Sequence, residues 1–311
     1  MKKFFIFFLV LCTLAIAQEN FENAEYITLK QKDAVVEQPV KEEKAITFSA
    51  GADLVTQYWY NGLVCENQGL IFQAYAALNL NLYKGSVLTS LDLNVSTFAT
   101  FLDSPISDWA HDNDENLRSY YEQDLTVDLA FNFADCFTFD VAYALFNSPI
   151  HAFDTYQQLE FGIEFNEKEF TCLPFAIVPY ARLIAEIDGA NDGRNEGVYL
   201  ELGLKPNYEI KISDNYSMTL TLPMACGFSL DNYYDFGVKD DNDFVWGFYS
   251  LTARLDVPLS FIPEKFGTWN WHIQATMLVV DSQLMKYNNA WRLSNNDNVH
   301  VFVGTGIDLS F

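Results

Sequence analysis

Basic residues are scarce in this chain of 311 residues: 18 lysines and arginines stand against 42 aspartates and glutamates, a formal net charge of −24. Nucleic-acid binding needs cationic contacts to phosphates, so this balance excludes nucleic acid as a partner. Charged residues make up only 19% of the chain, whereas hydrophobic residues make up 50% and aromatic residues 16%. A disordered protein is therefore also excluded, because disordered chains are poor in such residues.

Long apolar segments and paired cysteines are missing too. Beyond the N-terminus no run approaches about 18 apolar residues, which excludes a transmembrane helix there. Cys65, Cys136, Cys172 and Cys226 form no Cys-x-x-Cys pair of the kind found in structural zinc sites. Cys136 and Cys172 fall in predicted turns on the same side of the fold, where they either form a disulfide or stay free thiols. We predict no metal and no cofactor.

The N-terminus has the features of a secretory signal peptide. Lys2 and Lys3 precede the apolar run 4–16, and Ala17 completes an A-x-A cleavage site, so residues 1–17 are the expected signal peptide. Residues 18–45 are polar and show no sustained period, which predicts a periplasmic linker. An exported chain without a hydrophobic helix can cross a membrane only as a closed barrel.

From residue 46 to residue 311, apolar and polar residues alternate with period two. Leu91 and Leu93, for example, alternate with Asp92 and Asn94, as in a strand with two unlike faces. The pattern predicts an all-β fold, a transmembrane antiparallel up-and-down β-barrel of about 12 strands after a cleaved signal peptide. The expected strands span 46–60, 70–83, 87–101, 120–133, 137–147, 154–166, 174–188, 197–210, 216–231, 243–259, 268–282 and 299–311.

Connections and aromatic residues fit the same interpretation. Short turns at 84–86, 134–136 and 213–215 alternate with long polar loops at 102–119, 189–196, 232–242 and 283–298, as periplasmic turns alternate with external loops. Amphipathic rings favour the depth of the lipid headgroups. The expected outer rim is Tyr58, Trp59, Tyr60, Tyr120, Tyr121 and Tyr156, and the expected periplasmic rim is Phe133, Phe165, Trp269, Trp271 and Phe311.

Two segments resemble known outer-membrane proteins. The final strand, ending in Phe311, resembles the terminal strand of bacterial outer-membrane barrels, which implies recognition by the barrel assembly machinery and a place in outer-membrane lipid. The hairpin 52–78 resembles the opening hairpin of the TorF-type porin family. Its Tyr58-Trp59-Tyr60, Gly62 and Gln68-Gly69 match that pattern, whereas Asn61 replaces the usual Arg. The resemblance implies a porin-like barrel.

Ionisable residues that alternate with the apolar ones are predicted to line the lumen. The candidates for selectivity are Asp53, Asp92, Asp124, Asp128, Asp140, Glu160, Glu164, Arg182, Glu186, Glu201, Lys205, Arg254, Asp256 and Asp308. Glu122, His272 and His300 are expected to face inward with them. An acidic lining attracts cations, so the sequence predicts a channel for ions or small hydrophilic solutes, with a mild preference for cations.

Two other functions are weighed against the channel. Hydrogen-bonded acids could fill the barrel and close it, leaving a non-conducting structural or adhesive protein that acts through the loops 102–119 and 283–298. An enzyme at the rim is disfavoured, because His111 and His151 fall in loops without a recognisable serine motif. We therefore expect no catalytic residues.

Overall fold

The computed structural model describes residues 45–311, apart from 68, 104–118, 169, 172, 174, 192–194, 214–215, 235–244 and 292–296. The predicted signal peptide 1–17 and all but the last residue of the linker 18–45 lie outside the described residues. So does most of the loop 102–119, with His111. The Cys136 thiol is free, and Cys172, its suggested partner, also lies outside the described residues.

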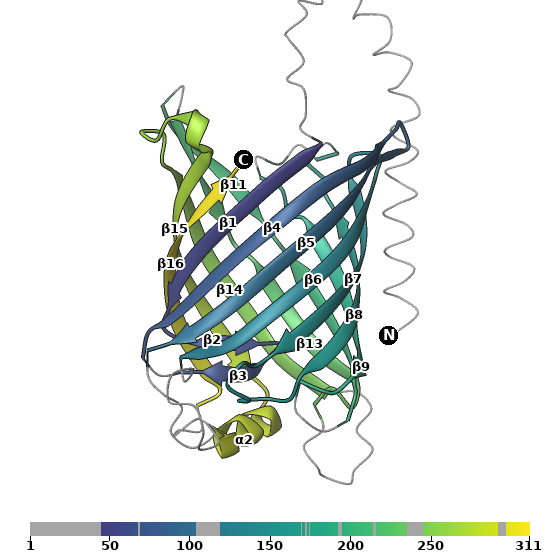
Figure 1. The fold of residues 1–311 in the computed structure, drawn as a ribbon, viewed down its shortest axis with the longest axis vertical. Helices are drawn as coiled ribbons and strands as arrows, with labels where there is room; N and C mark the ends of the chain where they lie inside the picture. The colour runs from purple at the N-terminus through teal and green to yellow at the C-terminus, as the bar shows by residue number, and fades with distance from the viewer. Residues whose placement is uncertain are drawn as a thin grey trace, which may run out of the picture. The chain divides into compact units, whose positions relative to one another are not determined.

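Twelve antiparallel strands form a closed ring, which confirms the predicted fold class (Figure 1). Neighbours in sequence are neighbours in space, and the ring closes where the first strand pairs with the last. The ring consists of β1 (Ile46–Val55), β4 (Ile71–Lys84), β5 (Leu88–Leu102), β6 (Tyr120–Phe133), β7 (Phe137–Asn147), β8 (Tyr156–Phe165), β9 (Pro179–Asp188), β10 (Val198–Leu204), β13 (Met224–Asp231), β14 (Val245–Pro258), β15 (Thr268–Val280) and β16 (Val299–Ser310).

The period-two pattern sorts side chains onto an outer and an inner face. On β6, Leu125, Val127 and Leu129 are exposed, whereas Asp124 is buried and Asp128 is half-buried. Exposed leucines and valines on many strands give the barrel an apolar exterior. A closed barrel with such an exterior is suited to a lipid bilayer, where every backbone polar group must be satisfied internally. This is the architecture of bacterial outer-membrane proteins.

Two of the predicted strands are interrupted by proline. The predicted strand 197–210 splits into β10 and β11 (Asn207–Ser213) around Pro206, and the predicted strand 216–231 splits into β12 (Tyr216–Thr221) and β13 around Pro223. Proline has no N–H to donate to the ladder. Because β11 pairs with β12 and β12 pairs with β14, the two segments extend the sheet beyond the closed ring.

The prediction of one strand over 46–60 is wrong. Strand β1 ends at Val55, and β2 (Tyr58–Tyr60) pairs with β3 (Leu63–Glu66) in a separate two-stranded sheet. The turn between them is Asn61-Gly62, with φ values of 48° and 85°. Asn-Gly tolerates positive φ at both positions and is a strong hairpin signal. We call residues 58–66 the inner hairpin.

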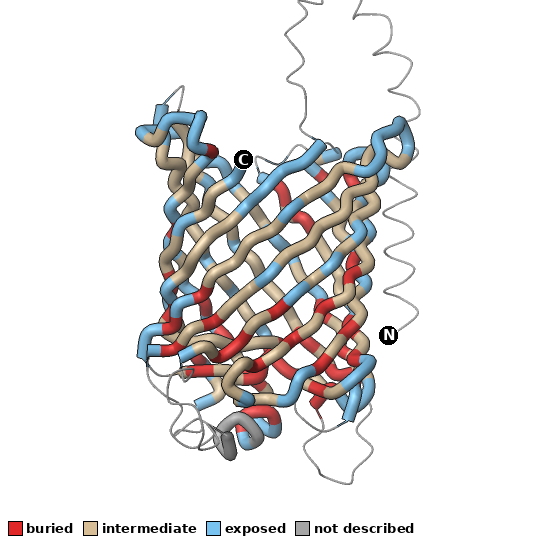
Figure 2. Tube along the Cα trace, in the orientation of Figure 1, coloured by how far each residue is buried: buried red, intermediate tan, exposed pale blue. Residues whose placement is uncertain are grey.

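Buried residues gather at the end of the barrel that carries β2, β3 and the helix α2 (Ser282–Trp291) (Figure 2). Leu63 of the inner hairpin packs there with Phe248, Leu284 and Met285 in one apolar cluster. This is the end opposite the C-terminus (Figure 1), and we call it the external end because it carries the predicted external loop 283–298. The helix lies in the predicted loop 283–298. No helix in the described ranges is long and apolar enough to cross a membrane.

The prediction of an outer aromatic rim is wrong for several of its residues. Tyr121 and Tyr156 are buried in apolar clusters, and Tyr58 and Tyr60 of the inner hairpin pack against those clusters instead of facing lipid. Tyr120 stacks on Phe101, with ring centroids 4.7 Å apart. At the opposite end, the exposed periplasmic aromatics include Phe133, Trp271 and Phe311.

Candidate pore interior

Most of the predicted interior residues contact side chains of neighbouring strands, on the face opposite the exposed apolar side chains, whereas Glu186 accepts the backbone N–H groups of Asn191 and Gly197. Glu201 pairs in register with Arg182, and Asp256 with His272. Paired residues share a face, because side chains alternate with period two. The inner face therefore combines ion pairs, hydrogen-bonded amides and acids without a basic partner.

Both bases of the wall formed by β8, β9 and β10 are held by carboxylates. Arg182 lies 3.6 Å from Glu160 and 3.5 Å from Glu201. The Lys205 ammonium lies 2.6 Å from Glu164. These pairs join β8, β9 and β10, so the positive charge of that wall is already compensated by adjacent acids.

The wall formed by β4, β5 and β6 uses amides instead of bases. Asn79 donates to Asn94 over 2.6 Å, and Asn94 donates to Asp128 over 2.8 Å. Asn81 donates to Asp92 over 2.8 Å, and Asn132 donates to the other oxygen of Asp92 over 3.0 Å. Amide donors stabilise a carboxylate but supply no positive charge, so the acids of this wall have no compensating cation among the described residues.

Two further acids of β6 lie deeper, beside the inner hairpin. Glu122 is 3% and Asp124 is 7% exposed. One oxygen of each, Glu122 Oε2 and Asp124 Oδ1, has no hydrogen-bond partner in the described part of the chain. With Asp92, Asp128 and Asp140, they form what we call the acidic wall, whose members have no ion pair with any described base. Asp140 on β7 faces Gly162, the residue paired with it on β8.

A second cluster lies where the chain ends meet. His272 is fully buried, with Nε2 2.9 Å from Asp53 and Nδ1 2.9 Å from Asp308. Arg254 contacts Asp308 at 2.7 Å and Asp256 at 2.8 Å. Most of these residues are far apart in the sequence. They meet because closure of the ring makes β1, β16, β15 and β14 consecutive strands of the wall.

Tyr75 belongs to the same group of residues. We call this group the seam cluster, and it consists of Asp53, Tyr75, Arg254, Asp256, His272 and Asp308. The Tyr75 hydroxyl donates to Asp308 over 2.5 Å, and its ring covers Gly51 on the neighbouring strand. A Cβ atom at Gly51 would lie 2.4 Å from the ring, so only glycine leaves the tyrosine room to reach across. Gly203 opposite Tyr180 repeats this arrangement.

The seam cluster is the one group of described residues with metal-ligand geometry. Ligand atoms of Asp256, His272 and Asp308 lie within 4.8 Å of one another. Arg254, however, already contacts both acids at 2.7 and 2.8 Å. A divalent cation would have to displace or face this guanidinium, so the cluster is better described as a salt-bridge network.

The inner hairpin contacts opposite parts of the barrel wall. Gln158 on β8 donates to the Tyr60 hydroxyl over 2.9 Å, and Arg182 on β9 donates to the Asn61 side chain over 3.2 Å. Trp59 packs on His300 of β16, with ring centroids 4.6 Å apart. The hairpin is therefore tied to β8, β9 and β16, and it crosses the interior near the external end.

A buried carboxylate also orders the connection between β8 and β9, outside the spanning strands. The backbone N–H groups of Ile177 and Val178 donate to Glu167, the latter over 2.9 Å. Burial alone would raise the pKa of Glu167, but these donors outweigh it and hold the pKa below its ordinary value. The ionised form of Glu167 therefore stabilises this connection.

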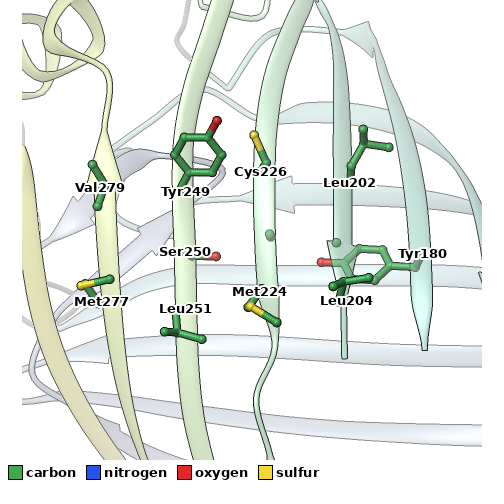
Figure 3. A pocket seen from close by; sticks show the side chains of 12 residues that line it. Tyr180, Leu202, Leu204, Met224, Cys226, Tyr249, Ser250, Leu251, Met277 and Val279 are labelled. Carbon is green, nitrogen blue, oxygen red and sulfur yellow. The ribbon is translucent and has the colours of Figure 1, made fainter. Parts of the chain in front are cut away.

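The outer face carries a shallow apolar groove across β10, β13, β14 and β15 (Figure 3). Leu202, Met224, Cys226, Leu251 and Met277 are among its lining residues. Leu202, Leu251 and Met277 are exposed side chains of the apolar exterior. The groove belongs to the surface that faces lipid and is not part of the solute path.

Solved structures with a similar arrangement of strands are outer-membrane barrels. The NanC porin is 9% identical, with a TM-score of 0.42, over 85% of this chain and 99% of that chain. An outer-membrane channel from Pseudomonas putida F1 is 10% identical, with a TM-score of 0.43, over 88% and 99%. The translocator domain of the autotransporter NalP from Neisseria meningitidis is 13% identical, with a TM-score of 0.35, over 96% and 98%. No protein-family model and no curated protein matches the chain. Likenesses of this degree carry no conclusion about function.

Proposed function

We propose that this protein is an outer-membrane channel for ions and small hydrophilic solutes, with a mild preference for cations. The observation that carries the proposal is the acidic wall. Arg182, Lys205 and Arg254 each lie against adjacent acids, whereas Asp92, Asp128 and Asp140 have no ion pair with a described base. A lining with excess negative charge concentrates cations and repels anions.

The inner hairpin sets the size of solute that this channel can pass. A ring of 12 strands is intermediate between filled eight-stranded barrels and open porins of 16 strands. Because residues 58–66 cross the interior, the external end is narrower than the ring alone allows. The hairpin also carries the match to the TorF-type porins, with Tyr58-Trp59-Tyr60 and Gly62, so we propose kinship with that family on this segment.

The proposal includes lipid and assembly partners but no catalysis. The exposed side chains of the strands contact outer-membrane lipid, and the last strand, with Phe311 at its end, is the contact for the barrel assembly machinery. The interior acids and His272 take part in ion pairs and hydrogen bonds, and this structural role accounts for them without a catalysed reaction.

A non-conducting structural or adhesive barrel is the second candidate. The apolar cluster of Leu63, Phe248, Leu284 and Met285 favours it, because this cluster fills part of the external end. That candidate needs the lumen to be sealed and the function to reside in the external loops.

Planar bilayer recording separates the two candidates. Purified folded protein is expected to insert and give discrete conductance steps in KCl. Folded protein that inserts but gives no step, with a cellular function lost on deletion of residues 104–118, would establish the non-conducting role instead.

A further inference from the structure

Three buried oxygens beneath the inner hairpin have no hydrogen-bond partner of ordinary geometry in the described part of the chain, although the Tyr58 and Thr100 hydroxyls lie near enough to act on the Glu122 carboxylate. They are Glu122 Oε2, Asp124 Oδ1 and Thr100 Oγ1. Thr100 is fully buried and pairs in register with Glu122, so its hydroxyl is directed to the same face. Asp124 follows Glu122 by two residues on β6, which places both carboxylates on that face about 7 Å apart at the backbone.

Two aromatic rings border these oxygens. Phe98 on β5 pairs in register with Asp124, and the ring of Tyr58 on the inner hairpin lies 6.0 Å from that of Phe98. Glu122 and Asp124 are both among the charges that act on Tyr58. The oxygens are thus enclosed by the strand wall on one side and by the rings on the other.

Leaving these oxygens without hydrogen-bond donors costs free energy, and this cost favours a ligand that supplies the donors. A buried acceptor without a donor lowers the stability of the folded protein by about 1–3 kcal/mol, and by more when the acceptor is charged. Bases elsewhere in the interior lie against acids, as Arg182 lies against Glu160 and Glu201. None of the described bases forms an ion pair with Glu122 or Asp124.

We propose that Glu122, Asp124 and Thr100 form a binding site for the primary ammonium group of a small organic solute. An –NH₃⁺ group has three N–H donors and no acceptor, which matches the three unpaired oxygens. Its alkyl stem would pack against Tyr58 and Phe98, whose ring faces attract a cation. This inference rests on the proposed channel function, since it names the class of solute that the external constriction selects.

A hard metal ion fits this set less well. Calcium takes six to eight oxygen ligands, whereas the three unpaired oxygens and the neighbouring Tyr58 hydroxyl offer fewer. The rings of Tyr58 and Phe98 occupy a side where coordinating waters would have to stand. Rings beside two carboxylates favour an alkylammonium over a hydrated metal.

Isothermal titration calorimetry on the full-length folded protein in detergent micelles tests the site. Propylammonium is the probe, and tetramethylammonium, K⁺ and Ca²⁺ are titrated at the same ionic strength. Propylammonium is expected to bind about tenfold more tightly than tetramethylammonium, which has no N–H donor. Equal affinities for both organic cations, or tighter binding of either metal ion, would overturn the proposal.

Four variants locate the binding. Asp124→Asn and Glu122→Gln are expected to weaken propylammonium binding about tenfold. Thr100→Val keeps the shape of the side chain and is expected to weaken it about threefold to tenfold. Glu264→Gln removes an exposed acid of the turn at the opposite end of the barrel, and is expected to change affinity less than about twofold.

Heat-modified migration on gels and far-ultraviolet circular dichroism show which variants fold. If an acid variant does not fold, Thr100→Val still tests the site. Equal weakening by Glu264→Gln would show general attraction to negative charge and overturn the site. Folded wild-type protein that binds no propylammonium also overturns it, even if the protein conducts. Binding without conductance would instead contradict the channel and leave the site intact.

Discussion

Tyr60 accepts a hydrogen bond from Gln158 over 2.9 Å, although the two residues are 98 positions apart in the chain. Tyr60 belongs to the inner hairpin, and Gln158 belongs to the wall strand β8. The Tyr60 ring also packs on Phe146 of β7, with centroids 5.5 Å apart. This relationship ties a segment that leaves the wall after β1 to a distant part of that wall, and so holds the inner hairpin in place at the external end.

Replacing residues 58–66 by a glycine-serine segment of equal length is expected to raise single-channel conductance about twofold or more, because pore width limits conduction. Planar bilayer recording in KCl measures the change. The matched control replaces the turn that contains Glu264 and Phe266 at the periplasmic end. Unchanged conductance in the folded hairpin variant would show that the hairpin does not constrict the path.

Arg182→Met is expected to destabilise the barrel by about 2 kcal/mol, since Glu160 and Glu201 would lose their shared cation. The Arg182 side chain is 31% exposed, so the cost is lower than for a fully buried pair. Lys205→Met is the control, because the exposed Lys205–Glu164 pair should contribute less than about 1 kcal/mol. Urea unfolding in detergent measures both, and equal losses would contradict the distinction.

Glu167 gives the stability of the β8–β9 connection a pH dependence of known sign. Its pKa in the folded protein lies below the ordinary value of 4.5, so its contribution is complete above pH 4.5 and declines as the pH falls through the folded pKa. Glu167→Gln is expected to cost about 1 kcal/mol near neutral pH. Unfolding free energies measured across pH should show this difference shrinking in acid, and a difference that grows in acid would be the opposite sign.

Neighbouring positions on β6 test which face meets lipid. Val127→Arg is expected to cost about 2–4 kcal/mol if the residue lies near the bilayer midplane. Thr126→Arg places the same charge on the inner face, beside Asp124 and Asp128, and should cost much less. Unfolding in lipid vesicles compares the two, and similar losses would mean that the two faces are not distinguished by lipid.

Alternation was enough to predict the ring of strands, because it is a local property that a barrel imposes on every strand. Strands β5 and β6 follow the predicted ranges closely. The inner hairpin was missed because Tyr58 and Tyr60 continue the alternation of β1. Asn61-Gly62 was the signal that could have separated them, since this dipeptide favours a two-residue turn.

The placement of the interior charges needed more than the pattern of the sequence. Alternation assigns Asp53, His272 and Asp308 to one face, but only the register across the seam brings them within 2.9 Å. Pairing between β1 and β16 joins the two ends of the barrel sequence, and no local pattern specifies it. The environment of the Thr100 hydroxyl likewise cannot be predicted from the sequence, because a threonine in a strand has no local pattern that indicates its neighbours.

The reversal potential of the double variant Asp92→Asn/Asp128→Asn in a KCl gradient tests most directly whether the acidic wall selects cations. The account predicts that the wild-type potential has the sign of a cation-preferring channel and that the variant moves toward zero. Glu264→Gln, which removes a charge at the periplasmic turn, should leave the potential nearly unchanged. A wild-type potential of the opposite sign, or one that stays the same in the double variant, would contradict the account.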